Sequence, residues 1–237
     1  MRVFAVLAAC AGLCFAQDLL PRSGSGWEGF KLNSSVKMKR TTTVEGRVPM
    51  ITIFTTKLAK LDAKTLTLET TAKNALGMEQ TTKNVVPRTG EAGTGETQKV
   101  EKLPGETLRA AGKDFACTRR RITVTGKAGK RVITEWVASS PKVRVKRSEV
   151  DYDGRGKVTS TLTMLLSSLG EKRKVGRSEV VCLTYKLLHK YGDREESGVA
   201  ITSRDVPGNT VRIDLETRSK GRLLFTARVE ALGMQVR

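Results

Sequence analysis

The sequence has few aromatic side chains and a single histidine, and each scarcity excludes a class of function. Phe, Trp and Tyr make up only 5% of the chain, too few for the stacking platform on which proteins bind single-stranded nucleic acid. A nucleophile paired with a histidine base would have to use His189, yet no Gly-x-Ser-x-Gly elbow is present. We therefore expect neither specific nucleic-acid binding nor an enzyme, and we assign no catalytic residue.

Motifs for metals and cofactors are also missing. Of the four cysteines, Cys10 and Cys14 lie in the N-terminal leader described below, which leaves Cys117 and Cys182. Two separated cysteines and one histidine do not make a closed four-ligand zinc set. No phosphate-binding loop, dinucleotide fingerprint or calcium loop occurs. The sequence thus predicts no metal and no cofactor.

Long hydrophobic runs are absent beyond the first sixteen residues. Residues 1–16 carry one charge, Arg2, followed by an apolar run that ends in Ala16, which is typical of a secretory signal peptide. The run is too short for a spanning helix. Within it, the stretch LAAC, which ends at Cys10, resembles a bacterial lipobox. We expect a periplasmic or extracellular protein without a transmembrane segment after cleavage, with lipid anchoring through Cys10 as the alternative.

Acidic residues are scarce relative to basic ones. There are 43 Lys and Arg against 24 Asp and Glu, a formal charge of +19, which favours contacts with acidic polymers or anionic headgroups. Alternation along a strand would place Arg119 and Arg121 on one face, and Arg144 and Lys146 likewise. If those faces align, these four residues could contact anions. Alternatively, the charges keep an outer face from sticking to other sheets.

What the sequence does have is alternation with period two, which indicates half-buried strands. Residues 30–38, FKLNSSVKM, place Phe30, Leu32, Val36 and Met38 on one side. Residues 87–104 break this pattern with Pro, Gly and charge, which predicts a flexible loop. We expect one all-β domain over 17–237, an open antiparallel half-barrel or a sandwich, with strands at 30–38, 47–58, 65–73, 114–125, 131–139, 142–152, 157–166, 178–191, 198–204, 210–217 and 222–232.

A spacing of about 65 residues recurs in the second half of the chain. Gly-Glu at 105–106 returns at 170–171, and Cys117 returns as Cys182. Turns and strand starts that recur together indicate a duplicated unit, here residues 105–169 and 170–233. In an exported chain the two cysteines could form a disulfide. The alternative is that each packs in its own unit as a small apolar residue.

Residues 131–169 resemble a known family. The stretch RVITEWVASSPKVRVKRSEVDYDGRGKVTSTLTML has a Trp-Val strand, a Pro turn, a strand of valines and basic residues, and an acidic-Gly hairpin. This order resembles the periplasmic lipoprotein-sorting and lipid-carrier proteins of the LolA-like type, with a fainter echo in the region after residue 198. Otherwise the chain is similar to exported bacterial β-repeat proteins.

The LolA-like resemblance implies an incomplete antiparallel barrel that holds acyl chains on its concave face. It makes the candidate lining residues Trp136 and the alternating set Phe30, Leu32, Val36 and Met38. The expected function is a non-catalytic exported binding protein that carries lipid or another amphiphile. The alternative is an envelope module that binds acidic polymers or anionic headgroups through its basic face.

Overall fold

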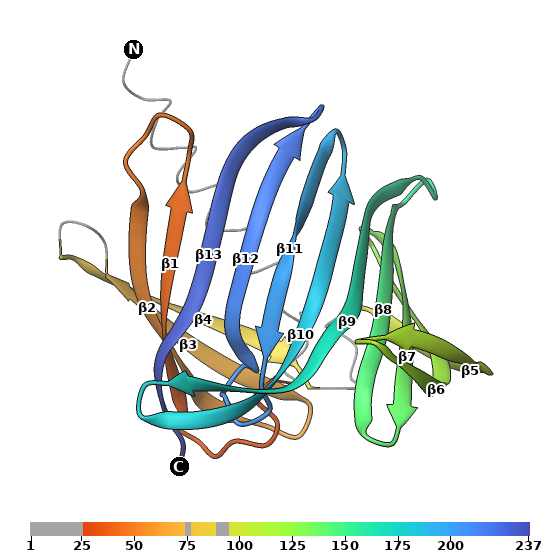
Figure 1. The fold of residues 1–237 in the computed structure, drawn as a ribbon, viewed down its shortest axis with the longest axis horizontal. Coiled ribbons are helices and arrows are strands. Elements are labelled where there is room, and N and C mark those ends of the chain that lie inside the picture. The colour runs from red at the N-terminus through yellow and green to blue at the C-terminus, as the bar shows by residue number, and fades with distance from the viewer. Residues whose placement is uncertain (1–25, 74–76, 89–94) are drawn as a thin grey trace.

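The computed structural model describes residues 26–73, 77–88 and 95–237, and the expected signal peptide at 1–16 lies outside them. Thirteen strands make up the described chain (Figure 1): β1 (Ser35–Thr43), β2 (Met50–Leu61), β3 (Thr65–Lys73), β4 (Glu79–Pro87), β5 (Thr97–Ala110), β6 (Lys113–Gly126), β7 (Gly129–Ser139), β8 (Lys142–Asp153), β9 (Val158–Val175), β10 (Ser178–Tyr191), β11 (Arg194–Thr202), β12 (Thr210–Ser219) and β13 (Arg222–Gln235).

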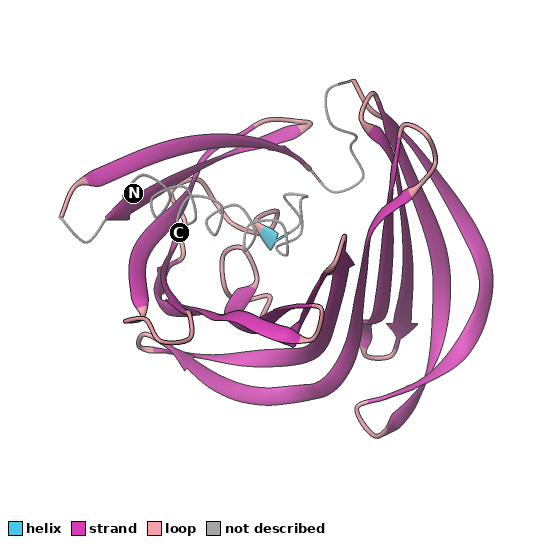
Figure 2. Ribbon diagram, turned by 90° about the horizontal axis from the view of Figure 1, so that it is seen from above, coloured by secondary structure: helices cyan, strands magenta, loops and turns pink. Residues whose placement is uncertain are grey.

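All thirteen strands belong to one antiparallel sheet. Its order is β4-β3-β2-β1-β13-β12-β11-β10-β9-β8-β7-β6-β5, so the first and last strands of the described residues are neighbours. The sheet curves into an open C, and β4 and β5 are its two edges (Figure 2). The expected all-β fold is confirmed as the open half-barrel, not the sandwich. In the described part of the chain, no helix is long and apolar enough to cross a membrane.

One side of the sheet faces the inside of the curve. The turn at Gly26 lies on the inner side of the curve in Figure 2, and the adjacent Trp27 packs in one buried cluster with Val36 and Met38. We call the side of the sheet that carries Val36 and Met38 the inner face. The glycine backbones at 26 and 208 are hydrogen-bonded at 2.8 Å, which holds this turn against the β11–β12 connection inside the curve.

Several of the expected element bounds are wrong. β9 continues to Val175 instead of ending at residue 166, and β11 begins at Arg194 instead of residue 198. Residues 97–104, expected in a loop, belong to β5, where Pro104 lies at a register irregularity between Leu103 and Glu106. An edge strand tolerates Pro there because no N–H is required on its open side. At the other end, β1 begins at Ser35 instead of residue 30, because Asn33 has a positive φ of 69° and turns the chain.

The repeat predicts similar surroundings for Cys117 and Cys182. Each is the fifth residue of its strand, in β6 and β10 respectively. Each thiol donates to the carbonyl oxygen two residues earlier, at 3.4 Å to Phe115 and 3.7 Å to Val180. The superposition of residues 105–169 on 170–233 remains a prediction.

Candidate functional site

The inner face is polar at the end of the sheet that carries the β8–β9, β10–β11 and β12–β13 turns, the upper end in Figure 1. We call this the hairpin end. Directly opposed residues of neighbouring strands form rows across the sheet, and the row nearest the hairpins is polar throughout. The next row mixes charged and apolar residues. The first row runs Arg131, Asp151, Ser160, Tyr191, Arg194 and Ser219, and the second runs Ile133, Glu149, Leu162, His189, Glu196, Thr217 and Phe225.

Farther from the hairpins the inner face becomes apolar. The third row keeps its charge at one end, from β5 to β8, where Arg120 lies opposite Glu135, and the fourth row has none over β9–β13. The third row runs Glu135, Arg147, Met164, Leu187, Gly198, Leu215 and Ala227, and the fourth runs Leu166, Tyr185, Ala200, Ile213 and Val229. Phe54, Leu68, Val86 and Met164 are only partly buried where they pack on this core. The inner face is therefore amphiphilic along the strand direction.

A buried carboxylate organises the charged end of the third row. Glu135 in β7 is 2% exposed and contacts three arginines, Arg120 at 2.6 Å, Arg144 at 2.9 Å and Arg147 at 3.3 Å. Burial alone would raise the pKa of the Glu135 carboxyl, but the three guanidinium groups outweigh it and lower the pKa below its ordinary value. The carboxylate is thus held charged, and three guanidinium groups share it.

Salt bridges extend this cluster along β8 and β7. Arg147 also pairs with Glu149 at 2.8 Å, and Arg131 pairs with Glu149 at 3.0 Å and Asp151 at 2.7 Å. The cluster has one more base than acid, because it contains four arginines and three acids: Arg120, Arg131, Arg144, Arg147, Glu135, Glu149 and Asp151.

A bulge turns Arg144 away from the face that alternation assigns to it. Trp136 pairs with Lys146, but its neighbour Val137 pairs with Arg144, so β8 has one extra residue there. A bulge re-aims side chains in this way. Arg144 consequently reaches Glu135 on the inner face, and no partner for its buried Nε lies among the described residues. The hydroxyl of Tyr185 donates to the Arg144 carbonyl oxygen at 3.0 Å and ties β10 to the bulge.

The four candidate anion contacts therefore do not share one face. Arg119 and Arg121 are on the outer face of β6, as alternation predicts, and Lys146 is also on the outer face of β8. Arg119 pairs with Glu106 at 3.5 Å, and the Lys146 Nζ lies 4.8 Å from the centre of the Trp136 ring. Arg144 is on the inner face instead, so the expectation that all four side chains form one cationic stripe is wrong. Anion contact by the other three remains a prediction.

His189 belongs to a second polar cluster on the inner face, around Glu196 of β11. Its Nδ1 lies 3.3 Å from the Glu196 carboxylate, which is 3% exposed. Tyr191 at 2.9 Å and Thr217 at 3.4 Å donate their hydroxyls to the same carboxylate. Burial first, then the hydrogen bond to Glu196, raises the pKa of Tyr191 to about 12. This phenol stays a hydrogen-bond donor at neutral pH.

The candidate lining residues separate into three groups. Val36 and Met38 are on the inner face but buried, each 4% exposed. Phe30 and Leu32 precede β1, so neither belongs to its alternating face. Trp136 points to the opposite side of β7 from Glu135, where the Glu106 carboxylate accepts its indole N–H. The partly exposed inner-face residues Phe54 and Met164 were not singled out in the sequence, because only the pairing of distant strands brings them together.

The two described cysteines do not form a disulfide. Both are buried free thiols, and β7, β8 and β9 separate their strands in the sheet. Of the two alternatives, the structure has each cysteine packed in its own surroundings. Desolvation by burial raises the pKa of both thiols, which disfavours the reactive thiolate.

We expect Cys117 and Cys182 to be alkylated only after unfolding. Purified protein treated with a maleimide without reductant should show both peptides unmodified in the native state and fully modified in denaturant, as read by peptide mass spectrometry. Recovery of the two cysteines as one disulfide-linked peptide would contradict this arrangement.

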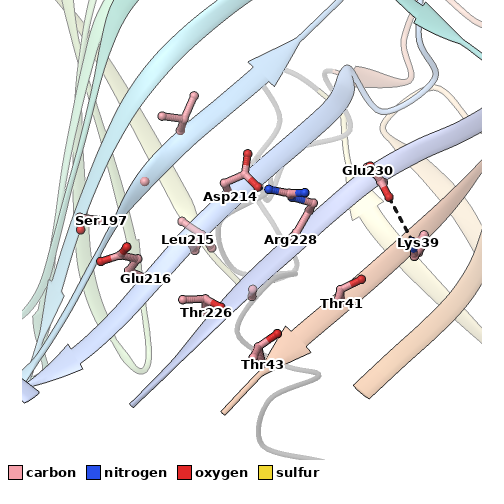
Figure 3. Close-up of a pocket in the computed structure, with 13 residues that line it drawn as sticks. Lys39, Thr41, Thr43, Ser197, Asp214, Leu215, Glu216, Thr226, Arg228 and Glu230 are labelled. Atoms are coloured by element: carbon pink, nitrogen blue, oxygen red, sulfur yellow. Dashed lines mark hydrogen bonds and ion pairs between the residues drawn. The ribbon is translucent and has the colours of Figure 1, made fainter. Parts of the chain in front are cut away.

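A groove of about 870 Å³ lies on the outer face across β11, β12, β13 and β1 (Figure 3). Hydroxyl groups of Thr41, Thr43, Ser197 and Thr226 line it together with ion pairs. Asp214 bridges Arg212 and Arg228 at 2.6 Å each, and Lys39 pairs with Glu230 at 3.5 Å. Because most of the lining residues are polar or charged and these charges already pair with one another, we do not assign the amphiphile to this groove.

No protein-family model matches the sequence, and no curated protein matches it significantly. Solved structures do match. A LolA superfamily protein from Nitrosomonas europaea is 11% identical, covers 94% of this chain and 93% of its own, and has a TM-score of 0.38. An outer membrane lipoprotein-sorting protein domain from Vibrio parahaemolyticus is 10% identical, covers 94% and 90%, and has a TM-score of 0.35.

An exported protein with a YmcC-like fold from Bacteroides fragilis also matches, at 6% identity over 87% of this chain and 97% of its own, with a TM-score of 0.35. Structures of the LolA type are thus among those similar to this chain, as the resemblance of residues 131–169 predicts. Function therefore has to be inferred from the inner face itself.

Proposed function

We propose that this protein is a non-catalytic binding protein, periplasmic or extracellular, that carries a lipid or another amphiphile on the inner face of its sheet. The observation that carries the proposal is the order of the inner-face rows, from polar at the hairpin end to apolar deeper in. An amphiphile placed along the strands would meet polar groups at the hairpin end, and its tail would contact the partly buried Phe54, Leu68 and Met164 that cover the buried apolar rows. Burial of its tail would contribute roughly 25 cal/mol per Å² of apolar surface.

The polar residues at the hairpin end suit a headgroup more than a reaction. His189 contacts Glu196, whose carboxylate also accepts hydrogen bonds from Tyr191 and Thr217. Those donors hold the carboxylate in place, and the raised pKa of Tyr191 keeps its phenol protonated. Groups fixed in this way can recognise a polar headgroup by hydrogen bonding, which requires no chemical step.

Native mass spectrometry of protein purified from its own compartment tests the proposal. We expect a bound lipid or amphiphile that organic extraction releases and that the refolded protein takes up again. Protein without any co-purified amphiphile, combined with salt-sensitive binding to an anionic polymer, would contradict the carrier function and favour the envelope-module alternative.

A charge introduced on the inner face should remove the ligand. Leu162 is partly buried on the inner face of β9, where it lies opposite His189. Leu188 of β10 is adjacent but points to the outer face and is 38% exposed. We expect Leu162→Glu to abolish co-purification of the amphiphile, because it replaces a partly buried apolar contact by a carboxylate that lies directly opposite Glu149. Leu188→Glu is the matched control and should retain it.

The readout is the ratio of ligand-bound to ligand-free protein in native mass spectra of the two variants, with circular dichroism confirming that both are folded. Equal loss of ligand in both variants, or equal retention, would show that the ligand does not contact the inner face near Leu162.

A further inference from the structure

We propose that two copies of the chain associate edge to edge through β4, in an antiparallel arrangement centred on Thr81. This inference does not depend on the ligand, since it concerns an edge of the sheet and not the inner face. β4 (yellow in Figure 1) is the last strand at one edge, with no further strand beyond it in the described part of the chain. Its backbone groups on that side are available to a new ladder.

β4 lacks two features that commonly block such pairing, a bulge and an internal proline. Its register with β3 is unbroken over all nine residues, and only the terminal Pro87 lacks an N–H. Residues 79–85 are all exposed, including Val85 at 65%. The opposite edge differs: β5 contains Pro104 and a register irregularity beside it, and both features disfavour pairing with another strand. The two edges are therefore not equivalent, and β4 is the open one.

The charges of β4 favour a second copy of the same strand as its pairing partner. In an antiparallel pair centred on Thr81, Glu79 lies opposite Lys83 of the second copy, and by symmetry Lys83 lies opposite its Glu79. Both residues point to the outer face, opposite Lys73 and Glu69 of β3 respectively. Opposed residues on one face of an antiparallel pair are close enough for ion pairing. The strand is therefore self-complementary, as a two-fold interface requires.

This pairing would extend a row of alternating charge that already exists within one copy. On the outer face Lys57 lies opposite Glu69, and Glu69 lies opposite Lys83, with a Lys83–Glu69 distance of 3.5 Å. Glu79 and Lys73 of the second copy continue the row, so that positive and negative side chains alternate across the interface.

Other registers lose both ion pairs. Centring the pair one residue earlier places Lys83 opposite Gly77, and centring it one residue later places Lys83 opposite Thr81. The register centred on Thr81 also opposes the two Thr81 side chains, each of which is hydrogen-bonded to Thr71 of its own copy at 3.0 Å. The charges thus specify a single register.

A contact limited to edge strands is smaller than standard protein interfaces, so we expect a weak, concentration-dependent dimer. Sedimentation equilibrium of the purified protein over a wide concentration range should fit a monomer–dimer model. Lys83→Glu would place like charges opposite each other twice, and we expect it to weaken dimerisation about ten-fold. The double variant Glu79→Lys/Lys83→Glu restores opposite charges across the interface but sets like charges against Lys73 and Glu69 within each copy, so it should dimerise more strongly than Lys83→Glu and more weakly than the original chain.

Lys99→Glu on the β5 edge is the matched control, because it makes the same change of charge on an exposed strand. It should leave dimerisation unchanged, whereas raised salt should weaken the dimer of the original chain. A monomer at every concentration, a Lys83→Glu variant that dimerises normally, or a charge-swapped double variant as weak as the single one would each overturn the proposal.

Discussion

Replacing Glu135 with glutamine is expected to lower the free energy of unfolding by about 3–5 kcal/mol. The side chain is 2% exposed and is shared by Arg120, Arg144 and Arg147. A glutamine of nearly the same shape would remove the negative charge that all three arginines contact and leave their positive charges to repel one another. Denaturant titration at neutral pH, followed by circular dichroism, measures the loss.

The matched control is Asp214→Asn, since Asp214 also joins two arginines but is 33% exposed on the outer face. Water solvates the arginines that remain there, so we expect a loss of about 1 kcal/mol or less. If Glu135→Gln proved no more harmful than Asp214→Asn, the buried cluster would not contribute to stability in the way described.

The pH dependence of this difference has a defined sign. The pKa of Glu135 is lowered in the folded protein from its ordinary value of 4.5. The unfolded chain therefore takes up this proton first as the pH falls, and the stability that Glu135 contributes is present above pH 4.5 and lost below it. The difference in denaturation midpoint between the original chain and Glu135→Gln should be full at pH 7 and should shrink below pH 4.5.

Replacing Gly198 with alanine is expected to cost about 3 kcal/mol, at the upper end of the range for overpacking. Gly198 is in β11, opposite Leu215 of β12. A Cβ at this position would overlap the backbone carbonyl oxygen of Asp214, and two paired strands in the middle of the sheet would have to separate. The same denaturant titration measures the effect.

Gly154→Ala is the control, because a Cβ at this turn glycine would meet no atom within 4 Å. It should leave the free energy of unfolding unchanged or raise it by a few tenths of a kcal/mol, through reduced freedom of the unfolded chain. An equal effect of the two substitutions would mean that the close approach of β11 and β12 at Gly198 does not limit stability.

The sequence predicted the central strands of the sheet but not the two edge strands, β4 and β5. The alternation of residues 65–73 and 178–191 gave the bounds of β3 and β10 as the structure has them. β4 was not predicted, and most of β5 was expected to be loop. Period two arises where one face of a strand is buried and the other is not, whereas β4 is exposed on both faces over most of its length. An edge strand therefore leaves little trace in the sequence.

The candidate site was predicted less well, because it depends on register. Nothing in the spacing of Arg144 and Lys146 indicates the extra residue that sends them to opposite faces. The Glu135 cluster had a weak signal, since an acid beside Trp136 in a strongly apolar strand needs bases opposite it. Which arginines contact Glu135 could not be inferred from the sequence. They come from two strands, β6 and β8, and Arg144 reaches Glu135 only because of the bulge in β8.

The pairing of β1 with β13 affects how the molecule can be assembled. During synthesis or translocation, β1 emerges long before β13. The segment β1–β4 therefore lacks β13, the strand that pairs with β1, until almost the whole chain has emerged. Bringing such distant segments together is slow because a very long loop must close. A nascent chain that lacked only β13 would consist of two separate ladders, β1–β4 and β5–β12. We expect chaperones that hold unfolded chains to bind the unpaired edges of β1 and β12.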